Sequence, residues 1–284
     1  MPVRPQFRTD LADEAGRLFE QDEGTPLPGV RVAEESLCGL RLCRVEIRDA
    51  EGARALRKAE GLYFSLELPR WFDRGAECFP DAVRALAELI RRCLDGEPES
   101  VLVAALGNPD VTPDALGSLA ASSVLVTRHL KQRHDERFRD FCSLALCRPG
   151  VLGSSGMESA LQIATLCREL RPALVVAIDA LAGSEPERLC RTVQVSDAGI
   201  CPGSGVGNDR RELSRESLGV PVVSIGIPTV IDAGAFGGEA LGQMFVTPRD
   251  IDSLVRAGAR VIGYALDLAL HRELTIADVD MLLG

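Results

Sequence analysis

Four short, almost continuous runs of apolar residues restrict the possible folds of this chain more than any other feature. They cover residues 101–106, 141–147, 173–178 and 220–227. Segments with helical periodicity lie between them, at about 113–131 and 157–170. Strands that are apolar on both faces are typical of a parallel sheet with helices on each side. The alternation of strand and helix therefore predicts an α/β domain with a mainly parallel sheet.

The two ends of the chain carry weaker signals. Residues 1 to about 30 are polar and rich in proline, without a period, and predict an arm or extension. Short alternating stretches at 41–47 and 61–68 predict two further strands. A last long helix is expected from Thr247 to about His271, with Thr247 as its N-cap and a proline at its first position. A short polar tail is expected after it.

The composition limits where the protein works and what it binds. The 284 residues are 46% hydrophobic, enough for one large core, and no apolar run approaches the ~20 residues of a membrane helix. The N-terminus lacks the apolar stretch of a secretory signal, so we expect a soluble protein that stays inside the cell. The formal net charge of −10 and the lack of a basic cluster argue against binding to a nucleic acid.

The nine cysteines do not form a recognisable framework. Cys38 and Cys43 are separated by four residues, as are Cys142 and Cys147, and no C-x-x-C occurs in the sequence. Most of the cysteines lie in apolar runs, where a thiol packs as a small hydrophobic group. We therefore expect buried structural thiols, with a metal or redox site as the alternative.

Two aspartates follow apolar runs, where the ligand site of an open parallel sheet lies. Asp114 comes after the first run and directly follows Thr112 and Pro113. It lies at the expected start of a helix, where free N–H groups and the helix dipole favour a negative charge. Asp179 closes the third run. Because both runs end at the same edge of the sheet, we expect the two carboxyl groups to lie close together.

Neighbouring carboxyl groups are suited to proton transfer. They cannot both ionise easily, so the pKa of one rises and that of the other falls. Such a pair supplies a base that activates water and an acid that protonates a leaving amine, as peptide hydrolysis requires. Each residue also has a simpler interpretation: Asp114 as a charge at the start of a helix, and Asp179 as an ion-pair partner.

A glycine-rich segment occupies residues 202–208. Gly203, Gly205 and Gly207 allow positive φ angles and let backbone N–H groups approach a ligand, and Asn208 ends the segment. The glycine spacing does not match the G-x-G-x-x-G of dinucleotide-binding loops. We expect a loop that binds the substrate backbone or an oxyanion; the alternative is a structural turn.

Several other catalytic signatures are missing from the sequence. Asp197 and Asp232 are each followed by Ala-Gly, which lacks the hydroxyl of the pepsin-like motif. No G-x-S-x-G is present for a serine hydrolase. Three histidines, His129, His134 and His271, lack the spacing of a zinc site, so neither a metal nor another cofactor is expected.

Motifs spread over nearly the whole chain carry a family resemblance. They cover residues 8–12, 106–108, 111–117, 126–130, 177–182, 202–208, 225–230 and 246–248. Two of them, Thr-Pro-Asp-Ala-Leu-Gly at 112–117 and Ala-Ile-Asp-Ala-Leu-Ala at 177–182, contain the two aspartates singled out above. In sequence and in order, these motifs resemble the germination protease family of spore-forming bacteria.

The resemblance implies a cytoplasmic endopeptidase of the spore core that degrades small acid-soluble spore proteins during germination. It implies a tetramer that is made as a zymogen, with Asp114 and Asp179 as catalytic residues and no metal. It also implies a three-layer α/β fold similar to that of hydrogenase-maturation endopeptidases.

The same resemblance locates a processing site near the N-terminus. Residues 9–14 look like the family's processing site and like the acidic, apolar and small residues of its substrates. We expect residues 1–10 to be a propeptide that the protein removes by cutting between Asp10 and Leu11. Residues 11–284 are then expected to form a single α/β peptidase domain.

The chain departs from the family pattern in two places. Cys201 stands where the family usually has histidine, so no acid, base or ligand role is expected of this side chain. The stretch between Asp232 and Val246 is shorter than in relatives. Two alternatives remain open: a metal-dependent maturation-type endopeptidase of the same fold, and an inactive relative that serves as an interaction module.

Overall fold

The computed structural model describes residues 9–23, 27–70, 72–203, 210–236, 241 and 244–283, and they form a mixed α/β fold. The α/β class predicted from the sequence is therefore confirmed. The described part of the chain has nine strands, all in one sheet. They are β1 (Val30–Leu37), β2 (Leu40–Ile47), β3 (Gly61–Glu67), β4 (Ser100–Ala105), β5 (Ser143–Cys147), β6 (Leu174–Gly183), β7 (Thr192–Ser196), β8 (Val222–Asp232) and β9 (Phe245–Val246).

The sheet has the strand order β1-β2-β3-β7-β8-β6-β4-β5, and β9 pairs with β8. Strands β5, β4, β6 and β8 run parallel, and they are the four apolar runs recognised in the sequence. On the other side of β8, strands β7, β3, β2 and β1 form an antiparallel extension. The sheet is therefore parallel in the half formed by the four apolar runs and antiparallel in the other half.

Ten α-helices are described, and they alternate with the strands in the second half of the chain. They are α1 (Ala12–Glu23), α2 (Ala50–Leu56), α3 (Phe79–Arg92), α4 (Leu116–Ala120), α5 (Arg128–Gln132), α6 (Leu152–Ser155), α7 (Ser159–Leu170), α8 (Arg215–Leu218), α9 (Ile251–Leu270) and α10 (Ile276–Leu283). None of the helices in the described ranges is both long and apolar enough to cross a lipid bilayer.

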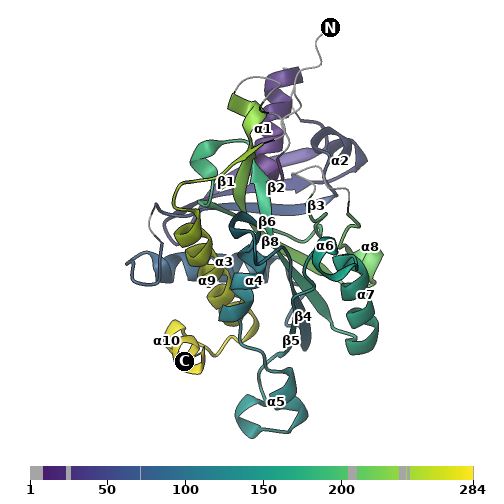
Figure 1. Cartoon of the computed structure of the whole chain (residues 1–284), viewed down its shortest axis with the longest axis vertical. Helices are drawn as coiled ribbons and strands as arrows, with labels where there is room; N and C mark the ends of the chain where they lie inside the picture. The colour runs from purple at the N-terminus through teal and green to yellow at the C-terminus, as the bar shows by residue number, and fades with distance from the viewer. Residues whose placement is uncertain are drawn as a thin grey trace.

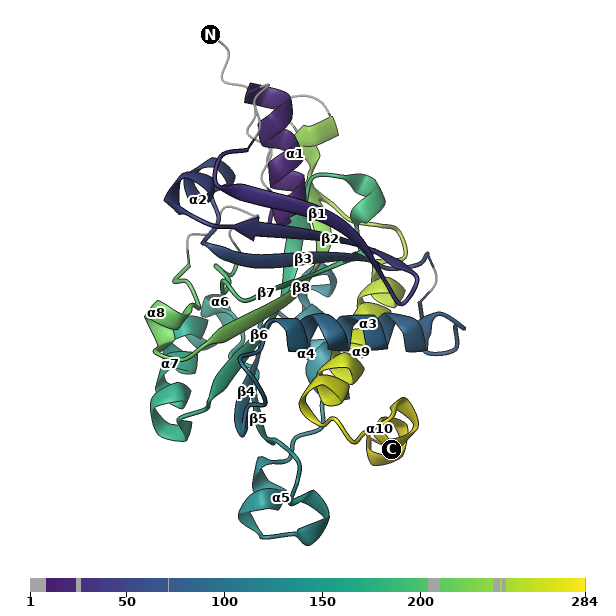
Figure 2. The same ribbon diagram turned by 180° about the vertical axis from the view of Figure 1, so that it is seen from behind.

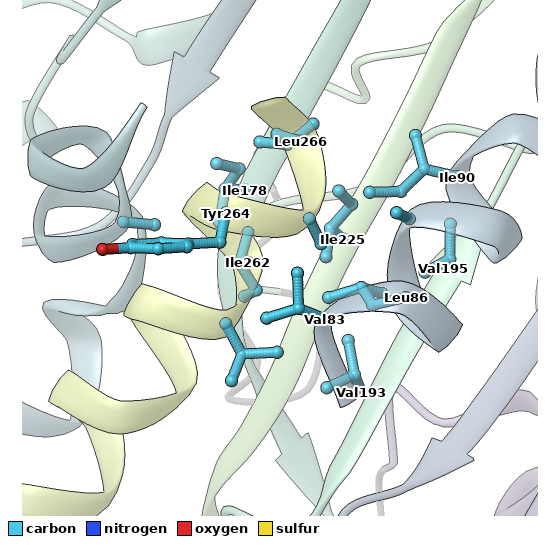
Figure 3. Packing of buried hydrophobic residues seen from close by; sticks show 14 of the residues in the cluster. Val83, Leu86, Ile90, Ile178, Val193, Val195, Ile225, Ile262, Tyr264 and Leu266 are labelled. Atoms are coloured by element: carbon cyan, nitrogen blue, oxygen red, sulfur yellow. The ribbon is translucent and has the colours of Figure 1, made fainter. Parts of the chain in front are cut away.

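One face of the sheet, called here the covered face, is packed continuously. Helices α3 and α9 lie together on this face, on the opposite side of the sheet from α7 and α8 (Figures 1 and 2). Side chains from β2 to β8, among them Ile178, Val195 and Ile225, meet Leu86 of α3 and Ile262 of α9 (Figure 3). Burial of this large apolar surface is the main stabilising contribution to the fold.

The opposite face, called here the open face, carries two smaller apolar clusters. In one, Ile163 of α7 packs over Leu102 and Ala177 of β4 and β6. In the other, α1 and α2 pack over β2 and β3, with Leu56 and Tyr63 buried between them. The strands between the two clusters carry small or polar residues on this face: Ser65, Gln194, Ser196, Ser224 and Gly226. The open face therefore has space for a site in its middle.

The predicted N-terminal arm is wrong for residues 12–23, which form α1. Leu11 and Ala12 are fully buried. Ala15 and Phe19 pack with Ala12 on the open-face cluster that also contains Leu56 and Tyr63. Ala12, Ala15 and Phe19 recur at helical spacing, a signal that could have located this helix among its many charged residues.

The helix predicted at 113–131 is also wrong, because the chain there forms the 3₁₀ turn Thr112–Asp114 and then α4 and α5 as separate helices. Asp267 of α9 accepts a hydrogen bond from the N–H of Leu125 at 2.9 Å, which holds the intervening stretch in a non-helical path.

The C-terminal expectations need two corrections. α9 begins at Ile251, because the hydroxyl of Thr247 donates to the carbonyl of Thr229 at 2.9 Å instead of capping a helix. The predicted polar tail contains α10, whose Val279 is buried against the covered-face core.

Candidate active site

Asp179 lies inside β6 and not at its end as predicted. β4 stops at Ala105, opposite Ile178, so Asp179 is the first residue of β6 beyond this neighbour. Its side chain belongs to the open face, because it alternates with that of Ile178 in the covered-face core. Asp179 is only 4% exposed, and its Oδ1 accepts a hydrogen bond from the N–H of Ala180 at 3.0 Å. The carboxyl group of Asp179 is therefore buried beside the end of the neighbouring parallel strand β4.

Asp114 ends the 3₁₀ turn that follows β4. Its Oδ2 and its backbone carbonyl both accept hydrogen bonds from the N–H of Asn108, at 2.9 and 3.0 Å. Gly107 permits this approach, since its φ is 94° and a Cβ there would lie 2.0 Å from the Asp114 carbonyl oxygen. The loop residue Asn108, and not a helix N-terminus, supplies the N–H group for Asp114.

Thr229 anchors the turn from the neighbouring strand, and the sequence did not reveal it. Its hydroxyl donates to the carbonyl of Pro113 at 2.7 Å. Thr229 is the extra residue of a bulge in the pairing of β8 with β6. Bulges of this kind place a side chain outside the regular ladder. Thr229 can therefore reach the turn and hold Asp114 beside β6.

The structure brings the two aspartates close enough for the charge of one to affect the pKa of the other. Burial raises the pKa of Asp179 well above its ordinary value, and the charges of Asp114 and Asp10 raise it further. Burial also raises the pKa of Asp114, against the opposing effects of the Asn108 N–H and the Arg210 charge. Asp114 is the more exposed of the two, so it ionises first while Asp179 keeps its proton.

A cleft of about 1010 Å³ lies on the open face between the two apolar clusters. Its walls include Lys58, Leu181 and Gln194. Asp114 and Asp179 do not line it. Leu181 lies two residues beyond Asp179 on the same face of β6, so the cleft reaches β6 two residues from Asp179.

The predicted processing site lies at this edge of the cleft. Asp10 lines the cleft, and its N–H donates to the carbonyl of Ala182 at 2.9 Å. The Oδ2 of Asp10 accepts a hydrogen bond from the N–H of Ala182 at 2.8 Å. Leu11, on the other side of the predicted scissile bond, is fully buried. The fold thus brings Asp10 close enough to Asp179 for its charge to raise the pKa of that carboxyl group.

The predicted glycine loop is described only in part. Gly203 has a φ of 74°, as a loop of this type requires, whereas Gly205, Gly207 and Asn208 lie outside the described residues. Cys201 lines the cleft, and its thiol donates to the carbonyl of Arg210 at 3.2 Å.

The other candidate ligands are dispersed. Within the described residues, no three His, Cys, Asp or Glu side chains are grouped in a way that could hold a metal ion. Burial lowers the pKa of His271 to about 4, and its Nδ1 accepts the N–H of Cys142. All nine cysteines are free thiols; Cys142, Cys167 and Cys190 are buried, and Cys38 is exposed.

Comparisons with known proteins show the family of the chain. Residues 9–242 match the family described as germination protease. The germination protease of Caldanaerobacter subterraneus is 36% identical, with 98% of each chain covered, and that of Clostridium tetani is 31% identical over 98% of this chain and 99% of its own. The germination protease of Bacillus cytotoxicus is 41% identical over 80% of this chain and 63% of its own.

Among solved structures, a NiFe hydrogenase maturation protease from Thermococcus kodakarensis is similar to 64% of this chain and 98% of its own, with 19% identity and a TM-score of 0.38. A similarity at this level supports no further argument.

Two neighbouring carboxyl groups near a cleft of this size form an arrangement that could serve hydrolysis. The chain belongs to the germination protease family, and it is an endopeptidase of spore germination.

Proposed function

We propose that this protein cleaves small acid-soluble spore proteins, with Asp114 and Asp179 as its catalytic pair. Membership of the germination protease family supports the substrate class. One observation carries the proposal for the site: Asp179 is buried with a raised pKa beside the charges of Asp114 and Asp10, and Asp10 belongs to a peptide segment in the cleft.

The two carboxyl groups take different parts in the hydrolysis. The carboxylate of Asp114 accepts a proton from a water molecule, whose oxygen adds to the carbonyl carbon of the scissile bond. The carboxyl group of Asp179 then gives its proton to the leaving nitrogen as the C–N bond breaks. The products are a carboxyl group and an amine, and the pair is left with one proton, which returns to Asp179 before the next cycle.

The protein is proposed to be made as a zymogen that removes residues 1–10 itself. The position of Asp10 supports this proposal, since the bond between Asp10 and Leu11 lies beside the cleft and the backbone of Asp10 is bound to Ala182. An N-terminal segment in this place keeps a protein substrate out until it is cut. Acid favours the cut, because the pair must hold one proton to work.

We place the active protein in the spore core as a homo-oligomer, a tetramer in line with the family resemblance. Apolar side chains around β9 are exposed and could pack between subunits: Phe236, Leu241, Met244, Phe245 and Val246. Light scattering on the purified protein measures the subunit number, and a monomeric mass would contradict this part of the proposal.

The central test uses the full-length protein at mildly acid pH. We expect it to cut a purified small acid-soluble spore protein after acidic residues and to acquire a new N-terminus at Leu11, both read by mass spectrometry. The Asp114→Asn variant should do neither while its circular dichroism is unchanged. An intact wild-type N-terminus, together with an intact substrate, would reject the proposal.

A second part of the same test distinguishes the proposed mechanism from the metal-dependent alternative. In the proposed mechanism a shared proton, and not a cation, neutralises the carboxyl pair, so EDTA should leave the rate unchanged. Loss of activity in EDTA, restored by one divalent cation, would favour the metal-dependent endopeptidase.

A further inference from the structure

Two side chains hold the carbonyl oxygen of Asp10. The ammonium group of Lys58 donates to it at 2.8 Å, and Nε2 of Gln194 donates to it at 2.9 Å. We infer that Lys58 and Gln194 form the subsite for the carbonyl group of the peptide bond that is cut, in the N-terminal segment and then in the substrate. This inference rests on the proposed function and extends it to residues that the sequence did not single out.

The edge of β6 supplies the rest of the subsite. β4 ends opposite Ile178, and four residues further along β6 the backbone of Ala182 pairs with Asp10. The N–H of Ala182 also binds the carboxylate of Asp10. Pairing of an extended peptide with a strand edge is a common mode of peptide recognition. The edge therefore holds the backbone of the residue before the scissile bond and binds its acidic side chain.

The register of the sheet puts this carbonyl group near the catalytic pair. Asp179 of β6 and Gln194 of β7 are both aligned with Gly226 of β8, which lies between them. Two strand spacings separate them, about 10 Å between their backbones. The side chain of Leu181 fills the space above Gly226, where a Cβ would lie 2.5 Å from its Cγ, and the charge of Asp10 acts on Asp179.

Lys58 reaches the same oxygen from the opposite wall of the cleft. It follows α2, whose C-cap residue Arg57 has a left-handed φ of 53°. Burial lowers the pKa of Lys58, and the negative charges of Asp10, Glu14 and Asp13 oppose this effect. Lys58 also donates to the carbonyl of Thr9 at 3.3 Å, so it binds two consecutive peptide groups of the N-terminal segment.

The chemistry of hydrolysis explains why such donors matter. When water adds to the carbonyl carbon, the C=O electron pair moves onto the oxygen, which becomes negatively charged. An ammonium group and an amide N–H already directed at this oxygen stabilise the charge, and removing one such donor typically costs about 10²–10³-fold in kcat.

The site survives the removal of residues 1–10. Beyond the cut, α1 stays attached, since Asp13 pairs with Arg188 and accepts a hydrogen bond from the hydroxyl of Ser65. The N–H of Ala12 donates to Oε1 of Gln194, which leaves Nε2 of that side chain directed at the vacated position. A substrate peptide can then take the place of Thr9 and Asp10.

The test compares lysine variants of the full-length protein. Lys58→Met is expected to slow both self-cleavage at Asp10 and cleavage of a synthetic peptide Thr-Glu-Leu-Ala by about 10²-fold, with most of the loss in kcat and little in KM. Lys58→Arg should recover part of the rate. Lys131→Met is the matched control, because Lys131 also donates to two backbone carbonyls, those of Arg139 and Phe141, but belongs to α5.

Gln194→Glu provides a second variant that keeps the acceptor for Ala12. It replaces the donor to Asp10 by an oxygen that repels the carbonyl, so it should also lower kcat. Wild-type rates in both Lys58→Met and Gln194→Glu would overturn the inference, as would an equal loss in Lys131→Met. A wild-type protein that cuts neither itself nor the peptide would overturn the proposed function and the inference together.

Discussion

The covered face and the open face of the sheet are built from alternate residues of the same strands, and they differ in almost every physical property. On β6, Ile178 contributes to the covered-face core, whereas its neighbour Asp179 lies on the open face with a raised pKa. On β8, Ile225 lies in the core, and Ser224 and Gly226 line the cleft. The twofold alternation of a strand separates the residues that stabilise the fold from those available for chemistry.

This difference between the two faces allows a buried carboxyl group in the centre of the sheet. The covered face supplies a large continuous apolar core, which offsets the cost of burying polar groups on the other side. The open face needs hydrogen-bond partners for each of these groups, and the N-terminal segment supplies some of them. A rigid sheet also holds the carboxyl groups in fixed positions, as catalysis requires.

The largest expected effect comes from exchanging Asp179, which sits on the open face. Asp179→Asn removes the proposed proton donor to the leaving nitrogen, so kcat/KM for peptide cleavage should fall at least about 10³-fold with unchanged thermal stability or a small gain. In the wild type, kcat/KM should decline as pH rises through the raised pKa of Asp179, because the pair then loses its shared proton.

The adjacent residue on the covered face is the control. Ile178→Val should lower the free energy of unfolding by about 0.5–1.5 kcal/mol and leave kcat/KM within about twofold of wild type. If Ile178→Val lowers activity as much as Asp179→Asn does, the separation of roles between the two faces is wrong.

The next largest effect is expected at Asp267, a buried acidic residue among the apolar residues of α9 on the covered face. Burial raises the pKa of Asp267 to about 8, from an ordinary value of 3.8. Between these pH values the unfolded carboxyl group is ionised and the folded one is not, so the stability contribution falls as pH rises from about 4 to about 8. Asp267→Asn keeps the acceptor for Leu125 and removes this dependence.

Thermal melts measured at pH 4 and pH 8 check this prediction. Asp267→Asn should be more stable than wild type at pH 8, by on the order of 2–4 kcal/mol, and similar to it at pH 4. A stabilisation of the same size at both pH values would show that proton linkage is not its cause.

The smallest effect is expected at Cys201, which lines the cleft of the open face. Cys201→Ser keeps a donor for the carbonyl of Arg210, so kcat/KM should stay within about twofold of wild type. Steady-state kinetics on the peptide substrate measure the change. A tenfold loss without unfolding would mean that the thiol itself takes part in the reaction.

Sequence reasoning predicted the parallel strands and placed Asp114 and Asp179 together. Long apolar runs specify buried parallel strands, and the carboxyl ends of such strands meet at one edge of the sheet. It failed at α1 and at the helix expected over 113–131. Few apolar residues mark α1, and the expected helix is interrupted by a hydrogen bond from Leu125 to the distant Asp267.

The sequence by itself determined the α/β class, through its apolar runs, and the family, through its motifs, and it predicted that Asp114 and Asp179 lie close together. Only the tertiary structure decided that Asp10, Lys58 and Gln194 meet at one carbonyl oxygen. Asp10 precedes α1, Lys58 follows α2 and Gln194 lies on β7, so no local sequence pattern links the three residues. The sheet register and the packing of α1 and α2 on the open face bring them together.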